Sequence, residues 1–95
     1  MIRNLLRDAV KKGNIEWQRH VLERMLERKI SRGTVKEVLL NGEIIENYPD
    51  NKPFPSALFF GRIRSQPFHV VGAFDSLTEW CFVITAYKPD LEYFE

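Results

Sequence analysis

The strongest constraint on the fold is a change in hydrophobic period at Asn41-Gly42. Before it, apolar residues recur at helical spacing in three segments, residues 2–12, 18–29 and 31–41. After it, aromatic and β-branched residues mark four strand-like segments, residues 43–48, 56–64, 67–75 and 80–87. This order predicts an α+β domain over residues 1–95, with three N-terminal helices packed on one antiparallel four-stranded meander sheet.

Turn and cap residues predict where these elements end. Gly13 ends the first helix, Ser31 is the expected N-cap of the third helix, and Gly42 is its expected left-handed C-cap. Residues 14–17 are expected to be a connector, and the proline-rich residues 49–55 a loop. The sequence therefore predicts no strand before residue 43.

A two-residue hairpin loop at Ser65-Gln66 would place Arg62 directly opposite His69. With Trp80 opposite Asp75, strict alternation then puts residues 82, 84 and 86 on the face that carries His69. Residues 85 and 87 would point to the other face. An error of one residue in either loop would exchange these faces.

Charge and composition limit the classes of protein to be considered. The net charge is only +1, but residues 1–40 carry +5 and residues 41–95 carry −4. This asymmetry indicates either a helical half that faces an anion or an ion-paired interface between the halves. The single cysteine, Cys81, allows no internal disulfide, and its apolar neighbours Trp80 and Phe82 are typical of an inert buried thiol. With no signal peptide and no long apolar stretch, we expect a cytoplasmic protein without a membrane partner.

Residues 20–28 contain the most distinctive polar pattern. His20, Arg24 and Arg28 recur every four residues and would form one ridge on the second helix, beside an apolar stripe that includes Val21 and Met25. Such a ridge could bind phosphate and position a general acid. Charges beside an apolar stripe are more often its solvated boundary, and Glu23 and Glu27 can pair with these cations.

The whole pattern resembles a small prokaryotic family known as domain of unknown function 4258, from about residue 17 to residue 90. The matching pieces are His20-x3-Arg24-x3-Arg28-x-Ile30-Ser31, Asn41-Gly42-Glu43, Tyr48, Pro55-Ser56, His69-Val70-Val71 and Thr85-Ala86-Tyr87-x-Pro89-Asp90. That family resembles the RelE/MqsR-like ribonuclease toxins. The resemblance implies helices on a curved antiparallel sheet, metal-independent cleavage of messenger RNA, and an antitoxin partner that can carry a zinc finger.

Cleavage by the ribose 2′-OH would need proton transfer and cations on the phosphate. The candidates for proton transfer are His20, His69 and Tyr87. The candidates for phosphate binding are Arg24, Arg28 and Arg62, because a guanidinium makes two-point contact. We expect no cofactor and no metal, although both histidines with Asp75 would be the ligands of a metal alternative.

A non-catalytic module is the rival from another class. The ridge could hold RNA or an acidic peptide without cutting it, and the strand at residues 43–48 or the tail containing Phe94 could pair with a partner chain. In that case His69 would be a satisfied histidine near the sheet edge, and Tyr87 an aromatic at the edge of the core.

Overall fold

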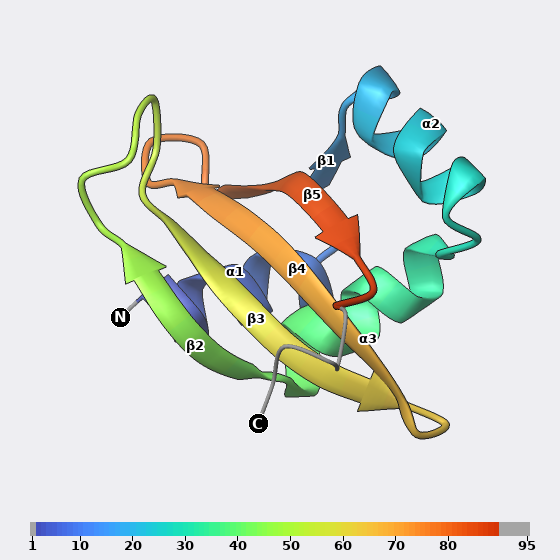
Figure 1. The fold of residues 1–95 in the computed structure, drawn as a ribbon. Helices are drawn as coiled ribbons and strands as arrows, with labels where there is room; N and C mark the ends of the chain where they lie inside the picture. The colour runs from blue at the N-terminus through green and yellow to red at the C-terminus, as the bar shows by residue number, and fades with distance from the viewer. Residues whose placement is uncertain (1, 90–95) are drawn as a thin grey trace.

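The computed structural model describes residues 2–89, which form three helices and five strands (Figure 1). In chain order these are α1 (Ile2–Lys11), β1 (Ile15–Trp17), α2 (Arg19–Glu27), α3 (Arg32–Asn41), β2 (Glu43–Tyr48), β3 (Ser56–Ile63), β4 (Gln66–Asp75) and β5 (Trp80–Tyr87). The tail at residues 90–95, which includes Phe94, lies outside the described residues.

The strands form one mixed sheet in the order β1-β5-β4-β3-β2. β1 runs parallel to β5, with Ile15 opposite Cys81, whereas the other three pairs are antiparallel. The expected four-stranded meander behind an unbroken block of N-terminal helices is therefore wrong. Residues 14–17, expected to be a connector, contain β1 between α1 and α2. Three residues are too few to show a strand period, and β1 is defined by long-range pairing with β5.

One face of the sheet is covered by α1 and α3, which lie behind it in Figure 1. The core forms there, where Phe59, Val70 and Val83 of the sheet meet Leu6 and Leu39 of the helices, all fully buried. Burying each such side chain contributes about 1.5–3 kcal/mol to folding. α2 stands apart at the sheet's edge and packs mainly against β5. Within residues 2–89, no helix is long and apolar enough to cross a membrane.

The hairpin between β3 and β4 turns one residue earlier than expected. Its two loop residues are Arg64 and Ser65, whose φ angles of 53° and 71° suit a tight hairpin turn. Arg62 consequently lies opposite Pro67, and His69 lies opposite Phe60, so the predicted Arg62–His69 pair is wrong. The register differs by two residues, however, which keeps Arg62 and His69 on the same face of the sheet.

A β-bulge in β5 overturns the second register prediction. Asp75 does pair with Trp80, as expected, but farther along Gly72 pairs with Val83 and Val71 pairs with Thr85, so Ile84 is an extra residue. Beyond Ile84 the alternation is reversed. Residues 85 and 87 therefore share the face of His69, and Ala86 is buried among the helices rather than on that face.

Of the two caps predicted for α3, the structure confirms the N-cap, and the predicted left-handed conformation of the C-cap is wrong. Ser31 is the N-cap, as predicted, and its Oγ accepts a hydrogen bond of 3.0 Å from the Thr34 backbone N–H. Gly42 is not a left-handed cap, because its φ of −77° and ψ of 171° are extended. Glycine is required there for space. A Cβ atom would lie 2.5 Å from the Val38 carbonyl oxygen and 2.6 Å from that of Phe60.

We predict that Gly42→Ala lowers the free energy of unfolding by about 1–3 kcal/mol, because both contacts involve backbone atoms that cannot rotate away. Urea denaturation measures this change. Gly33→Ala is the matched control, since the nearest atom to its added Cβ would be Ser31 Oγ at 3.8 Å. It should change stability by less than about 1 kcal/mol. Equal effects of the two substitutions would contradict the steric role of Gly42.

Candidate functional site

Three aromatic side chains form a row across the sheet face that α1 and α3 leave uncovered. Phe60 of β3 pairs with His69 of β4, and His69 pairs with Tyr87 of β5. We call Phe60, His69 and Tyr87 the His69 row. Their neighbours along the strands, such as Phe59 and Val70, point the opposite way into the core. The row is thus built by strand register rather than by nearness in sequence.

His69 and Tyr87 are in direct polar contact. The Nδ1 atom of His69 lies 3.2 Å from the Tyr87 hydroxyl oxygen, and the two rings meet edge-on with centroids 5.2 Å apart. On the other side, Phe60 also meets His69 edge-on, with centroids 5.7 Å apart. These contacts fix the imidazole between two aromatic rings and direct Nδ1 toward the hydroxyl.

Burial determines the protonation of His69. The residue is only 4% exposed, whereas Tyr87 is half-buried and reaches solvent. Desolvation lowers the pKa of the His69 imidazole below its ordinary 6.5. The ring is therefore neutral at pH 7, and an unprotonated Nδ1 can accept a proton from the Tyr87 hydroxyl. Tyr87 is the member of the pair that a ligand can touch.

Two arginines adjoin this row from opposite ends. The Arg62 guanidinium lies over the Phe60 ring, 5.5 Å from its centroid. Arg28, from the C-cap of α2, donates an Nη1 hydrogen bond of 2.9 Å to the Ala86 carbonyl oxygen, next to Tyr87 in β5. That bond ties the end of α2 to β5. A guanidinium has five N–H donors, so Arg28 keeps further donors for an anion.

The remaining predicted residues lie on α2. His20 and Arg24 are exposed, and no hydrogen bond or ion pair of either side chain is found within residues 2–89. The predicted ridge does flank the buried residues Val21 and Met25. The structure thus groups His69, Tyr87 and Arg62 on one face and places Arg28 beside them, with His20 and Arg24 on a separate element.

Phe60 was missed by the sequence analysis as a site residue. The only signal for it was its position two residues before Arg62 in an alternating strand, which places both on one face. Its pairing with His69 depends on the exact hairpin loop. A turn at Arg64-Ser65 would have had to be recognised first.

Two alternative chemistries find little support in the side chains. Cys81 is buried, as predicted, and burial raises the pKa of its thiol to about 12, which keeps it an unreactive thiol. The Asp75 carboxylate accepts hydrogen bonds from the Leu77 backbone N–H at 2.9 Å and from Thr78 Oγ1 at 3.0 Å. In the described part of the chain, no three His, Cys, Asp or Glu side chains gather as metal ligands would.

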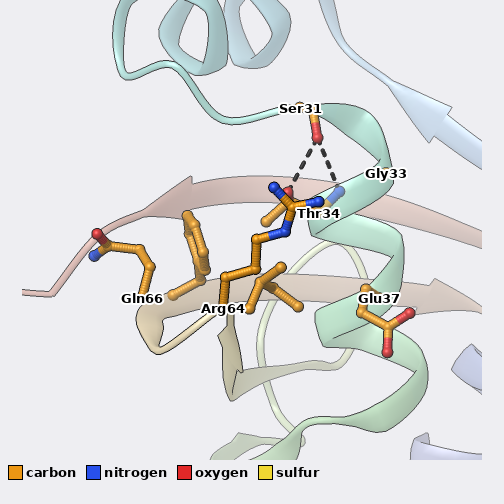
Figure 2. A pocket seen from close by; sticks show the side chains of 8 residues that line it. Ser31, Gly33, Thr34, Glu37, Arg64 and Gln66 are labelled. Carbon is orange, nitrogen blue, oxygen red and sulfur yellow. Dashed lines mark hydrogen bonds between the residues drawn. The ribbon is translucent and has the colours of Figure 1, made fainter.

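A hollow of about 590 Å³ opens elsewhere, between the first turn of α3 and the β3–β4 hairpin (Figure 2). Arg64 extends from the hairpin toward Ser31 and Thr34, which are hydrogen-bonded to each other. Glu37 lines the same hollow and brings an opposing charge. Because Phe68 on its wall points to the helix side of the sheet, this hollow is separate from the row.

Comparison with known protein families identifies a match. A family model described as domain of unknown function (DUF4258) matches residues 17–88, three quarters of the chain. The matched region runs from the last residue of β1 to the residue after β5, and so contains α2 and the complete His69 row. No curated protein and no solved structure matches the chain.

We predict that His69 makes the protein less stable in acid. The native state resists protonation of His69 whereas the unfolded chain does not, so stability falls as pH drops through 6.5 toward the lower native pKa. In His69→Gln this contribution is absent. The unfolding free energy of the wild type should therefore fall more than that of the variant between pH 7.5 and pH 5.5.

The control is Leu77→Gln, which introduces the same amide at a residue that is 94% exposed. Its unfolding free energy should change with pH as that of the wild type does. A His69→Gln variant that follows the wild-type curve at every pH would show that His69 is not desolvated.

Proposed function

The chain belongs to the DUF4258 family, and we propose that it is a metal-independent endoribonuclease that cuts RNA at the His69 row. The observation that carries this proposal is the 3.2 Å contact between His69 Nδ1 and the Tyr87 hydroxyl, on a sheet face that also presents Arg62. The resemblance of the family to RelE/MqsR-like ribonuclease toxins supports the same reaction class. Fold-level likeness alone would not suffice, because one fold supports many functions.

The proposed reaction is attack of a ribose 2′-oxygen on the adjacent phosphorus. The Tyr87 oxygen accepts the 2′-OH proton while its own proton passes to His69 Nδ1. The bond from O2′ to phosphorus forms, the bond from phosphorus to O5′ breaks, and the departing O5′ takes a proton from water. The hydroxide that remains takes the extra proton back through Tyr87, which returns His69 to its neutral form. The products are a 2′,3′-cyclic phosphate and a 5′-hydroxyl. Each positioned proton-transfer group typically contributes about 100- to 10,000-fold in rate.

The arginines supply the positive charge that this transition state needs. Arg62 and Arg28 adjoin the row and would hold the non-bridging oxygens of the reacting phosphate, where a planar guanidinium makes two contacts. Arg24 and His20 lie one and two helical turns before Arg28 on α2. We assign both to neighbouring RNA phosphates rather than to the reacting group, because they are exposed on another element.

As a toxin-like nuclease, the chain would act within a toxin–antitoxin module. A partner antitoxin, of the kind that can carry a zinc finger, would then restrain the activity in the cytoplasm. Induction of the chain without such a partner should arrest growth. Induction of the Tyr87→Phe variant to the same protein level should leave growth unaffected.

Burial of His69 supports a second function, a non-catalytic RNA- or protein-binding module. An imidazole that is 4% exposed cannot itself contact a substrate, so the proposed cleavage depends on Tyr87. β2 also lies at an edge of the sheet, with Ile45 and Tyr48 exposed, where a partner strand could pair. A binding module would retain RNA or a partner chain and release no cleaved product.

We predict that Tyr87→Phe slows RNA cleavage at least about 100-fold, because it removes the hydroxyl and keeps the ring. Release of a 5′-hydroxyl product from a labelled RNA, in buffer with a metal chelator, measures the rate. Thr78→Val is the matched control, since it removes a hydroxyl from an exposed residue in the turn between β4 and β5. It should cleave at the wild-type rate.

An RNA with a single 2′-deoxyribose at the cleaved position provides the chemical control, because it lacks the nucleophile. It should resist cleavage there. Cleavage of that RNA, or undiminished cleavage by a folded Tyr87→Phe protein, would refute the mechanism. Wild-type binding to RNA with no cleavage would favour the non-catalytic module.

A further inference from the structure

Leu26 is unusually exposed for a leucine within a helix. Its side chain is 81% exposed in α2, whereas Val21 and Met25 of the same helix are buried. Together with the half-buried Leu22, Leu26 lines an open groove of about 460 Å³ whose other walls are Met25, Ile30 and Arg32. We call these five residues the α2 groove. An apolar groove of this kind on a peripheral helix marks an interaction surface.

The groove is distinct from the proposed RNA surface. In helical projection, Leu22 and Leu26 lie on one side of the buried Val21–Met25 stripe, and the His20–Arg24–Arg28 ridge lies on the other. Arg28 reaches β5 from the ridge side. A ligand in the α2 groove would therefore leave the ridge and the His69 row accessible.

The rim of the groove is cationic. Arg32 lines it directly and lies over the Trp17 ring, 6.0 Å from the ring centroid, which holds the guanidinium beside the apolar floor. Arg19 lies three residues before Leu22 in α2, so it flanks the same strip. The Glu23 carboxylate lies 3.7 Å from Arg19 Nε and offsets part of that charge, so Arg32 is the main cation of the rim.

We propose that the α2 groove docks an acidic amphipathic helix of a partner protein. Leu22 and Leu26 lie one helical turn apart on α2, and Ile30 continues the apolar floor beyond the end of the helix. Apolar residues of the partner helix would cover this floor, and its carboxylates would face Arg32 and Arg19. Charge complementarity of this kind selects an acidic partner over a basic one.

A second copy of this chain fits the groove poorly. A two-fold interface brings the same patch of both copies together, so the Arg32 guanidinium of each copy would be buried against a groove whose lining contains no acid. Burial of a cation without an acidic partner opposes that arrangement. The cationic rim therefore favours a different, acidic chain as the occupant.

Two synthetic 18-residue peptides test this proposal. Both carry leucines at helical positions i, i+3, i+4 and i+7, and their flanking positions are Glu in one and Lys in the other. The protein carries Trp80→Phe, so that Trp17, beneath Arg32, is the remaining tryptophan and reports binding by its emission. The Glu peptide should bind at least about 10-fold more tightly than the Lys peptide.

Matched substitutions locate the binding. Leu26→Gln should weaken binding of the Glu peptide at least about 10-fold, whereas Leu77→Gln should leave it unchanged. Leu77 is 94% exposed in the turn between β4 and β5, so neither variant loses core packing. Arg32→Glu should weaken binding of the Glu peptide and strengthen binding of the Lys peptide.

Four results would overturn the proposal. These are no binding of the Glu peptide, equal binding of both peptides, equal loss in Leu26→Gln and Leu77→Gln, or a dimer of the protein alone that Leu26→Gln abolishes. The last result would identify a second copy as the occupant. RNA cleavage by Leu26→Gln should stay at the wild-type rate, so failure here and failure of the nuclease proposal are separable.

Discussion

The extra residue Ile84 in β5 determines which side chains share a face with His69. Strict alternation along β5 would direct Ala86 to that face and Tyr87 into the helix-covered core. The bulge reverses this beyond residue 84, so a small residue is buried among the helices and the tyrosine hydroxyl meets the imidazole. His69 and Tyr87 thus meet on the face that α1 and α3 leave uncovered because β5 contains one extra residue opposite β4.

The neighbouring contacts hold this end of β5 in place. β1 pairs only with residues 81–83, and the later part of the strand is contacted by α2 through the bond from Arg28 to the Ala86 carbonyl. That bond satisfies a backbone acceptor at the sheet's edge. It also brings a cation next to Tyr87. Arg28 therefore links the stability of the strand end to the charge around the proposed reaction site.

α2 presents different chemistry on its two flanks. The side with His20, Arg24 and Arg28 borders β5, and the side with Leu22 and Leu26 forms the apolar groove rimmed by Arg32. The buried stripe of Val21 and Met25 separates them and anchors the helix. A nine-residue helix can in this way carry the proposed RNA-facing surface and the proposed partner-facing surface without overlap.

Much of the local structure could be predicted from the sequence, because its signals are local. The change of period at Gly42, the Ser31 cap and the bounds of β2 and β5 follow from spacing and residue type. β1 could not be predicted, since three residues gain a strand conformation only by pairing with β5. The bulge was equally hidden, because Val83, Ile84 and Thr85 are all good strand formers and none signals an extra residue.

The same distinction applies to the site. Residue type was enough to select His69, Tyr87 and the arginines as candidates. Their grouping depended on a hairpin loop at Arg64-Ser65 and on the β5 bulge, neither of which strict alternation predicts. The His20 ridge was correctly placed beside the apolar stripe. Its relation to the sheet depended on tertiary packing, which helical spacing does not encode.

The central claim is that a neutral His69 accepts a hydrogen bond from Tyr87. Long-range proton–nitrogen NMR of histidine-labelled protein at pH 7 tests this most directly, because it reports the protonation of each ring nitrogen. We predict an unprotonated Nδ1 in His69, with a ¹⁵N shift that moves in Tyr87→Phe and stays constant in Thr78→Val. A His69 ring protonated at pH 7, or one insensitive to Tyr87→Phe, would contradict the account.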